Sequence, residues 1–293
     1  MGKINDLDMS NWKELTDVWT DSLWIIPQRD NSGAHDGHYH GNFVPQIPHQ
    51  LLTRYTKAGD FVLDPFAGSG TTLIEAQRMG RNSIGIELQP SVAAESIGRI
   101  HSEQKEGIIA DTFVDDSRTF DTKRILETYN INSVQFIIYH PPYWDIIKFS
   151  EDENDLSNST SLDEFINNFR QVVRNTSAIL EKGRYCAVVI GDKYANSQLV
   201  PLGFYCMQAT QQEGLTLKAT IVKNFEEVLT KNGAKIESSK EMGQRELAYE
   251  IKKFKSGYYY LYEISSKDDK AEKEFNRLAN LSEDIIRHMI IKL

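Results

Sequence analysis

Short apolar runs alternate with longer amphipathic segments along most of the 293-residue chain. Apolar runs between turn residues are typical of strands, whereas apolar positions that recur every three or four residues are typical of helices. The pattern predicts strands near 61–63, 83–87, 134–139, 185–190, 217–222 and 258–264, and helices near 48–55, 71–79, 92–101, 161–180, 202–212 and 269–292.

The alternation of strands and helices predicts an α/β fold with a mostly parallel, doubly wound sheet. One expected strand, Tyr185–Ile190, is apolar at every position. Strands of this kind are usually buried on both faces, so we expect helices to cover it on both sides. Ligands of such sheets bind beyond the carboxyl ends of the strands, and the residues that follow each strand are therefore the first place to look for a site.

The composition, with 40% hydrophobic and 26% charged residues, is that of a soluble globular protein. No apolar run has the length of a membrane span and the N-terminus has no signal-peptide core, so we expect a cytoplasmic protein with no membrane partner. Cys186 and Cys206 lack metal or redox spacing, and neither carboxylate nor Cys follows His35, His38 and His40 at ligand spacing. We therefore expect no metal site.

The formal net charge of −9 argues mildly against a protein that coats nucleic acid, because phosphate contacts need Lys and Arg. The segment from Lys223 to Lys255 departs from this trend, since eight basic minus six acidic residues leave +2. A solvated face of mixed charge explains the segment as well as a phosphate track does. The charge still permits an enzyme with a locally basic groove.

A glycine-rich turn, Leu63-Asp64-Pro65-Phe66-Ala67-Gly68-Ser69-Gly70-Thr71-Thr72, follows the first expected strand. Gly68 and Gly70 suit a turn whose backbone passes close to a ligand and adopts conformations that other residues resist. The helix that begins near Thr71 then directs unpaired N–H groups toward that ligand. Glu87 ends the next strand, where nucleotide sites place the acid that binds ribose hydroxyls. The glycine spacing fits neither a Walker A loop nor the dinucleotide fingerprint of oxidoreductases.

A second motif, His140-Pro141-Pro142-Tyr143-Trp144, follows the expected strand at 134–139. The two prolines fix the backbone of this corner in advance. If the sheet is parallel, the glycine turn and the Pro-Pro corner meet at the same edge, and we expect Gly68 and Tyr143 to face one cavity.

The two motifs, in this order and on these elements, resemble those of the amino-methyltransferases, which use S-adenosylmethionine to methylate an exocyclic amine of a nucleic-acid base. The match spans roughly residues 40–222. The resemblance implies a Rossmann-like class I methyltransferase fold, in which an antiparallel pair of strands lies at the C-terminal end of the mostly parallel sheet. It implies an N-terminal arm (1–40), a catalytic domain (41–265) with a possible small target-recognition insertion (225–257), and a C-terminal helix (266–293).

The resemblance also implies which residues bind S-adenosylmethionine. The segment His40–Gln46 is similar to the one that closes over the methionine end of the cofactor. Asp116 stands where the family has its adenine-contacting acid, with Asp111 and Asp115 as rivals. The implied cofactor residues are Phe43, Pro45, Asp64, Phe66, Gly68, Ser69, Gly70, Thr71, Thr72, Glu87, Asp116 and Ser117.

The corner is implied to be catalytic through His140, Pro141, Pro142 and Tyr143, with Tyr143 and Trp144 against the base. The first position is usually Asp, Asn or Ser in the family, so His140 is a departure. A neutral imidazole has one acceptor nitrogen for the amine, but a protonated one has none. If His140 is catalytic, activity should fall as the pH drops through the imidazole pKa. The alternative is that His140 marks a lost activity.

Three functions remain open. The first is a site-specific DNA methyltransferase, such as those of restriction-modification systems, that flips adenine or cytosine out of the duplex and methylates adenine N6 or cytosine N4. The second is an RNA base methyltransferase, and the third a catalytically silent subunit that only binds the cofactor. Since no large target-recognition domain is visible, a second copy or a separate specificity subunit could supply part of the recognition.

Overall fold

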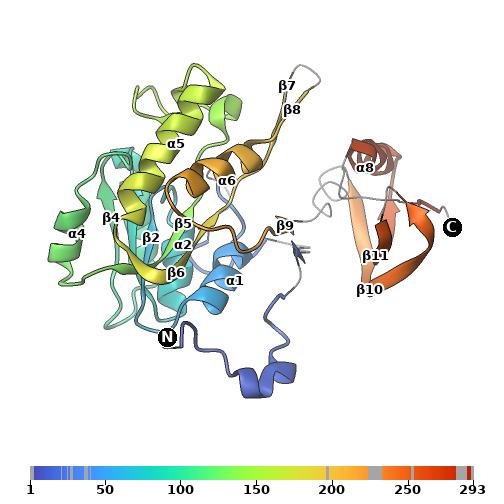
Figure 1. Cartoon of the computed structure of the whole chain (residues 1–293), viewed down its shortest axis with the longest axis horizontal. Helices are drawn as coiled ribbons and strands as arrows, with labels where there is room; N and C mark the ends of the chain where they lie inside the picture. The colour runs from blue at the N-terminus through green and yellow to red at the C-terminus, as the bar shows by residue number, and fades with distance from the viewer. Residues whose placement is uncertain are drawn as a thin grey trace. The chain divides into compact units, whose positions relative to one another are not determined.

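The structure, a computed structural model, describes residues 3–20, 22–24, 26, 29–35, 39, 41–195, 198–223, 233–251, 254–281 and 289–291. The chain forms two compact units. Figure 1 colours the chain from blue at the N-terminus to red at the C-terminus. Unit 1 comprises Met1–Thr20 and Arg29–Ala219, and unit 2 comprises Asp21–Gln28 and Thr220–Leu293. The segment 41–265, expected as one catalytic domain, crosses the division between them.

Unit 1 is built on a five-stranded, entirely parallel sheet with the strand order β4-β3-β2-β5-β6. The predicted α/β fold with a parallel, doubly wound sheet is confirmed. The order reverses direction between the neighbours β2 and β5, and this is the point where such sheets bind ligands. The strands are β2 (Phe61–Asp64), β3 (Asn82–Glu87), β4 (Ala110–Val114), β5 (Val134–Tyr139) and β6 (Leu180–Val188).

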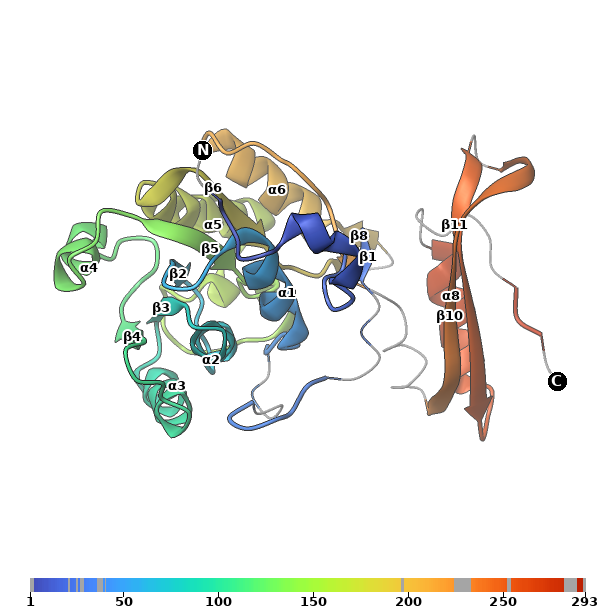
Figure 2. The ribbon, with the colours of Figure 1, turned by 90° about the horizontal axis from the view of Figure 1, so that it is seen from below.

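Helices cover both faces of this sheet, as Figure 2 shows. One face carries α1 (Gln46–Tyr55), α2 (Thr71–Arg78) and α3 (Pro90–Ser102), and the other carries α5 (Leu162–Ser177) and α6 (Leu202–Gln212). None of the described helices has the length and apolar composition needed to cross a membrane. The smaller elements are η1 (Met9–Glu14), α4 (Thr122–Thr128), η2 (Trp144–Ile146), η3 (Leu156–Asn158) and the hairpin of β7 (Lys193–Ala195) and β8 (Gln198–Val200).

Helix α5 illustrates how the sequence builds this core. The Ser161 hydroxyl accepts a hydrogen bond from the Glu164 N–H (3.2 Å) and so caps the helix at its start. Phe165 and Phe169, one helical turn apart, are fully buried. Phe169 packs edge-on against Tyr139 of β5, with 5.9 Å between the ring centroids. The helix is therefore anchored directly beneath the strand that leads into the Pro-Pro corner.

The C-terminal strands differ from the expectation. The strand expected at 217–222 contributes only β9 (Val222–Lys223), which pairs in parallel with β1 (Leu23–Trp24) in unit 2. The antiparallel pair exists as β10 (Ala234–Ile251) and β11 (Phe254–Ser266), but as a separate sheet of unit 2. An apolar run predicts a strand without identifying the sheet that it joins.

Strand β6 is consequently at the edge of the main sheet among the described residues. The residues Tyr185–Ile190 are only half-buried, so the expectation that helices cover them fully is wrong. The terminal helix is shorter than the predicted 269–292: α8 covers Lys270–Leu281, residues 289–291 are not helical, and the intervening residues lie outside the described ranges.

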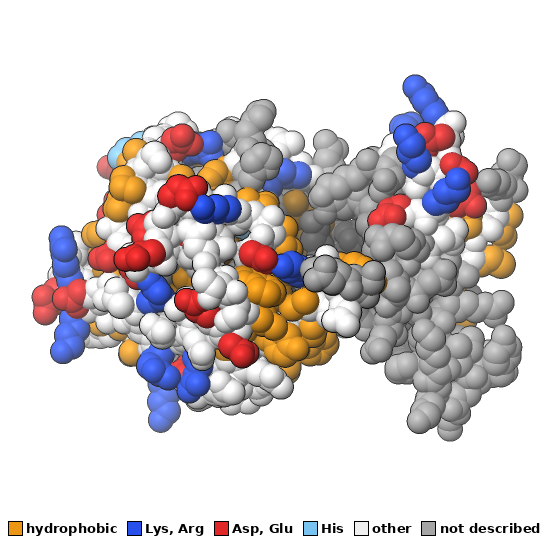
Figure 3. All heavy atoms as spheres, turned by 90° about the horizontal axis from the view of Figure 1, so that it is seen from above, with side chains coloured by type: hydrophobic (Ala, Val, Ile, Leu, Met, Phe, Trp, Pro, Cys, Tyr) orange, Lys and Arg blue, Asp and Glu red, His pale blue; other side chains and the backbone are white. Residues whose placement is uncertain are grey.

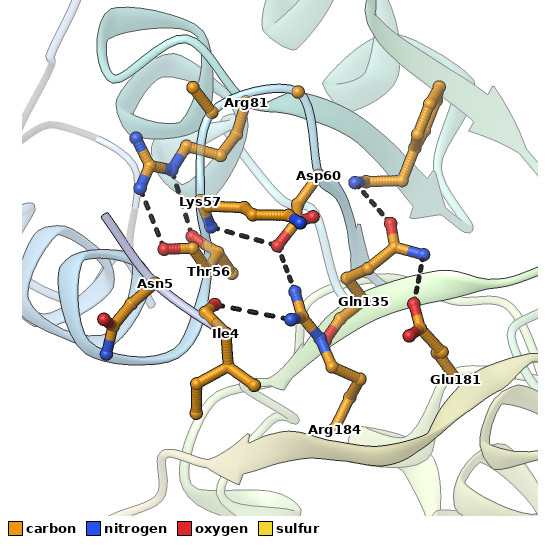
Figure 4. A network of polar contacts seen from close by, with 12 residues as sticks. Ile4, Asn5, Thr56, Lys57, Asp60, Arg81, Gln135, Glu181 and Arg184 are labelled. Atoms are coloured by element: carbon orange, nitrogen blue, oxygen red, sulfur yellow. Dashed lines mark hydrogen bonds and ion pairs between the residues drawn. The ribbon is translucent and has the colours of Figure 1, made fainter. Parts of the chain in front are cut away.

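A polar network links Asp60, just before β2, with Gln135 near the start of β5 and Arg184 of β6 (Figure 4). The Arg184 guanidinium pairs with the Asp60 carboxylate and donates to the carbonyls of Gln135 and Ile4 (both 3.3 Å). The Gln135 side chain accepts a hydrogen bond from the Phe61 N–H (2.9 Å). Because the Arg184 and Asp60 side chains are only 7% and 6% exposed, this is a buried ion pair.

Replacing Arg184 by Met should destabilise unit 1 by about 3–5 kcal/mol, because it leaves the Asp60 carboxylate buried without its partner. Urea unfolding followed by tryptophan fluorescence measures this. Lys148→Met is the control, since Lys148 pairs with a highly exposed Glu151 and its loss should change stability little. Equal effects of the two substitutions would contradict the assignment of a buried pair.

Candidate active site

A cavity of about 260 Å³ lies at the carboxyl ends of the sheet strands in unit 1. Its walls are the glycine turn after β2, the end of β3, the residues after β4 and the Pro-Pro corner after β5. Residues from 39–43 and from the loop 146–156 complete it. Gly68 and Tyr143 line the same cavity although they lie far apart in the sequence.

Two glycines of the turn adopt conformations that favour glycine. Gly68 has φ 49° and Gly70, the cap of α2, has φ 84°. A Cβ atom on Gly70 would lie 2.5 Å from the Ser96 hydroxyl oxygen, and one on Gly68 would lie 3.2 Å from the Tyr39 ring. Larger residues would therefore push the turn away from the helices and from the cavity.

The end of β3 is tied to this turn by Glu87. Its carboxylate accepts hydrogen bonds from the N–H groups of Gly68 and Gln89, both at 2.9 Å. Burial raises the pKa of Glu87, and the two N–H donors oppose that rise. The carboxylate forms part of the cavity wall, where it can accept hydrogen bonds from a diol.

The structure brings most of the predicted site residues into one wall. The predicted residues that line the cavity are Phe43, Phe66, Gly68, Thr71, Glu87, Asp116, Ser117, His140, Pro141, Pro142 and Tyr143. The predicted residues outside its lining are Pro45, Asp64, Ser69, Gly70, Thr72 and Trp144.

Several of the non-lining residues instead shape the turn. Asp64 is buried and accepts a hydrogen bond from the Phe66 N–H (2.9 Å), and burial raises the pKa of Asp64 to about 6. The Ser69 hydroxyl donates to the side-chain oxygen of Asn42, which connects the turn to the segment 41–46. These residues act on the cavity through the backbone that they hold.

Asp116 lines the cavity, whereas its rivals Asp111 and Asp115 do not. The Asp116 carboxylate pairs with Arg118 (2.7 Å). Arg118 also donates to the side-chain oxygen of Asn154 (2.6 Å), another lining residue. Asp111 instead accepts a hydrogen bond from the Tyr129 hydroxyl (2.6 Å). Of these three acids, Asp116 is therefore the one placed to contact a ligand in the cavity.

The corner after β5 places His140 between two aromatic rings. The imidazole centroid lies 4.4 Å from that of Phe43 and 5.7 Å from that of Tyr143. His140 Nε2 is 3.3 Å from the Tyr143 hydroxyl oxygen, within hydrogen-bonding distance. Burial lowers the pKa of His140 to about 4. The imidazole is therefore neutral at physiological pH and keeps one acceptor nitrogen.

Gly191, just beyond β6, holds the ring of Tyr143 in place. A Cβ atom on Gly191 would lie 2.8 Å from Cε2 of that ring, so the ring packs directly on the glycine backbone. The sequence did not identify this contact, because the two residues are neighbours only through the pairing of β5 with β6.

Trp144, expected against the base, points elsewhere. Its indole N–H donates to the Ser159 carbonyl (3.0 Å), and the Lys193 ammonium lies 4.2 Å from its ring centroid. Its backbone is in the left-handed region, with φ 53°, which turns the chain away after the corner. These contacts fit a role in holding the corner to the β7–β8 hairpin.

A clamp around the buried Glu75, which the sequence analysis missed, fixes the chain ahead of the segment 41–46. His35 Nε2 and His49 Nδ1 lie 2.7 and 2.8 Å from the two carboxylate oxygens of Glu75 on α2. Burial alone would raise the pKa of Glu75, but the hydrogen bonds with these histidines lower it to about 2. Arg78 donates to the Ser32 carbonyl (2.8 Å). His38 and His40 lie outside the described residues.

The N-terminal and C-terminal parts of the chain match different families of known proteins. The family model described as DNA methylase matches residues 3–97, about a third of the chain, including the glycine turn and Glu87. The resemblance to the S-adenosylmethionine-dependent amino-methyltransferases is thereby confirmed for this part. The Pro-Pro corner lies beyond the matched residues.

The C-terminal part matches a different family. The model described as Ribosomal protein S6 matches residues 208–292. The small ribosomal subunit protein bS6 of Oenococcus oeni is 47% identical over 74 residues, which cover 25% of this chain and 51% of that protein. The chain thus spans about half the length of this curated relative. The segment 225–257, expected as a possible target-recognition insertion, lies within the ribosomal match.

Solved structures with a similar fold include a TehB-like SAM-dependent methyltransferase from Corynebacterium glutamicum. It is 12% identical, with coverage of 81% of this chain and 92% of that chain and a TM-score of 0.39. Magnesium protoporphyrin IX methyltransferase from Synechocystis PCC 6803 is 12% identical, with coverage of 71% and 75% and a TM-score of 0.31. Both TM-scores are low, and the strand order of the sheet defines the fold of unit 1.

The His140 imidazole should titrate near pH 4, well below the usual value near 6.5, because burial disfavours its charged form. Two-dimensional ¹H–¹⁵N spectra of the imidazole groups over a pH series measure this, and the signal lost in His140→Asn identifies the residue. A titration near pH 6.5 would show that solvent reaches the ring and would contradict the neutral-acceptor geometry.

Proposed function

We propose that unit 1 transfers a methyl group from S-adenosylmethionine to the exocyclic amine of a DNA base, either adenine N6 or cytosine N4. The observation that carries the proposal is the convergence of the glycine turn and the Pro-Pro-Tyr corner on one cavity. The DNA methylase match over residues 3–97, which include the turn, supports DNA as the substrate class.

The cavity residues fit the proposed cofactor, which supplies a methyl group on a positively charged sulfur. Glu87 offers carboxylate oxygens at the end of β3 for the ribose hydroxyls, and Asp116 offers an acceptor for the adenine amine. The missing Cβ of Gly68 lets the ligand approach the backbone of the turn. Phe43 and Phe66 supply apolar surface in the same wall.

The corner fits the demands of an aromatic amine, whose lone pair is delocalised and must be oriented toward the methyl carbon. A methyl group donated by the bound cofactor would displace one proton from the amine, and a residue of the corner would have to take that proton. The neutral His140 ring can accept a hydrogen bond from the amine and take that proton, and the Pro141 carbonyl can hold the second hydrogen. Tyr143 can stack on the base after it has been flipped from the duplex.

The surface charges favour local contacts over an extended phosphate track. On the face that Figure 3 shows, the Lys and Arg side chains coloured on unit 1 are interspersed with Asp and Glu. This agrees with the net charge of −9. Sequence-specific recognition therefore calls for a further contribution, from a second copy or a separate subunit.

A second candidate function rests on the C-terminal match. The 47% identity to a small ribosomal subunit protein supports association of this part of the chain with the ribosome. Such an attachment would favour structured RNA as the methyl acceptor, because it would bring the cavity of unit 1 to ribosomal RNA. A methylation assay that offers both DNA and RNA as substrates separates the two candidate functions.

Purified protein incubated with labelled S-adenosylmethionine should label duplex DNA, and nucleoside analysis should identify N6-methyladenine or N4-methylcytosine. Parallel reactions contain single-stranded DNA, structured RNA and small ribosomal subunits. Labelled RNA with unlabelled DNA would overturn the DNA proposal in favour of the second candidate. Cofactor binding with no labelled product in any arm would identify a catalytically silent subunit.

Two substitutions should separate chemistry from cofactor binding. Tyr143→Ala should lower the turnover by about 100-fold or more, because it removes the group that orients the base, while the cofactor Kd stays nearly unchanged. Glu87→Ala should weaken cofactor binding first. Equilibrium dialysis and initial rates measure both quantities.

Asp111→Asn is the control for these two variants, since Asp111 does not line the cavity and Asn keeps an acceptor for the Tyr129 hydroxyl. It should leave rate and affinity nearly unchanged. A large loss of cofactor affinity in Tyr143→Ala would show that the corner belongs to the cofactor site instead of the base site.

A further inference from the structure

The segment 149–158 is a short loop of unit 1 that its own hydrogen bonds hold together. The Phe149 N–H donates to the Ser157 hydroxyl oxygen (3.2 Å). The Asp155 carboxylate accepts hydrogen bonds from the Ser150 hydroxyl (2.7 Å) and from the Ser157 N–H (2.8 Å). Compact surface loops whose ends are held close together often serve a function. Because this loop keeps its own shape, its contacts with the rest of unit 1 decide where it lies.

The loop forms part of the wall of the cavity, which Phe149, Asn154 and Asp155 line. Near its start, the Phe149 ring stacks on Tyr39, another lining residue, with 6.3 Å between the ring centroids. Further along the loop, the side-chain oxygen of Asn154 accepts a hydrogen bond from the Arg118 guanidinium (2.6 Å). The position of the loop therefore decides how far the cavity is enclosed.

Arg118 joins this loop to Asp116. Its Nε atom donates to Oδ1 of Asp116 (3.1 Å) and its Nη2 atom donates to Oδ2 (2.7 Å). This two-point pairing fixes the plane of the carboxylate. The same Nη2 atom makes the hydrogen bond with Asn154, and Nη1 donates to the side-chain oxygen of Asn168 on α5 (3.3 Å). One guanidinium thus connects the residues after β4, the loop and helix α5.

An ordinary surface ion pair does not explain this arrangement. Such a pair is exposed to water and joins two side chains only, whereas the Arg118 side chain is 14% exposed and holds three groups. Asp116 and Asn154 line the cavity, but Arg118 does not. Any effect of Arg118 on a ligand in the cavity therefore passes through the residues that it holds.

We propose that Arg118 is a positioning residue that couples recognition of the cofactor's adenine amine by Asp116 to the position of the loop 149–158. The inference rests on the cofactor assignment of the proposed function. Asp116, when it accepts a hydrogen bond from the amine, is fixed more firmly, and so are the guanidinium and its bond to Asn154. The loop is then held more tightly against the cavity. By linkage, a tightly held loop strengthens binding of the amine to the same extent.

Two ligands that differ only in the base test this coupling. S-Adenosylhomocysteine has the amine at position 6, whereas S-inosylhomocysteine has an oxygen there, so contacts of the rest of the ligand with the loop are common to both. Amide hydrogen exchange of the intact chain, at saturation with each ligand, reports how tightly the loop 149–158 is held. S-Adenosylhomocysteine should slow exchange in the loop by about threefold to tenfold more than S-inosylhomocysteine, the factor expected for one net hydrogen bond.

Three variants locate the coupling. In Arg118→Met, and in Asn154→Ala, which cuts the link from the side of the loop, the two ligands should slow exchange by equal factors. Lys148→Met is the matched control, because Lys148 directly precedes the loop, lies outside the cavity lining and pairs with the exposed Glu151. It should keep the difference between the ligands that the wild type shows.

The outcomes separate this inference from the proposed function. If neither ligand binds the wild-type chain, both the coupling and the cofactor assignment are wrong. If both ligands bind and slow exchange equally in the wild type, only the coupling is wrong. A difference between the ligands that survives in both Arg118→Met and Asn154→Ala would also overturn the role of Arg118 and leave the cofactor assignment intact.

Discussion

The hydrogen bond from the Gly68 N–H to the Glu87 carboxylate is the contact on which the rest of the site depends. It ties the end of β2 to the end of β3 at 2.9 Å and so fixes the floor of the cavity. Glycine is favoured there because the backbone has φ 49° and a Cβ would lie only 3.2 Å from the ring of Tyr39. The carboxylate thus orders the turn and also offers the acceptor that a ribose needs.

The corner depends on a different constraint, the partial burial of His140 between two aromatic rings. With aromatic rings on two sides, the imidazole cannot easily hold a charge, and its pKa falls to about 4. The family usually has Asp, Asn or Ser at this position, and each of these presents an oxygen acceptor at neutral pH. Burial keeps the His140 imidazole neutral, so it also presents an acceptor atom at neutral pH. A histidine at this position is therefore compatible with an active corner.

The sequence predicted the elements that local pattern determines. Apolar runs and glycine turns placed β2, β3, β5 and α2 closely, because each is specified by residues next to one another in the chain. Strand β4 was missed since Ala-Asp-Thr-Phe-Val contains polar residues and is only partly buried. That Trp144 lies outside the cavity lining could not be predicted, because its left-handed backbone has no signal in the sequence.

Contacts between residues far apart in the sequence could not be predicted from local sequence patterns. The contact of Gly191 with Tyr143 follows from the pairing of β5 with β6, and the clamp of His35 and His49 on Glu75 follows from tertiary packing around α2. The shift from acidic to slightly basic composition after residue 223 was the only trace of a second unit, and mixed charge on a solvated face explained it equally well.

The boundary between the two parts is set by packing instead of sequence similarity. The ribosomal match begins at residue 208, within α6, yet Ala209 and Thr210 of this helix are buried in unit 1. Helix α6 therefore has to keep the face that covers the sheet of unit 1, whatever it shares with the ribosomal family. After it the chain leaves unit 1 at residue 219, before any further strand can pair with β6. The half-exposed apolar edge at β6 is thus a direct consequence of where the second unit begins.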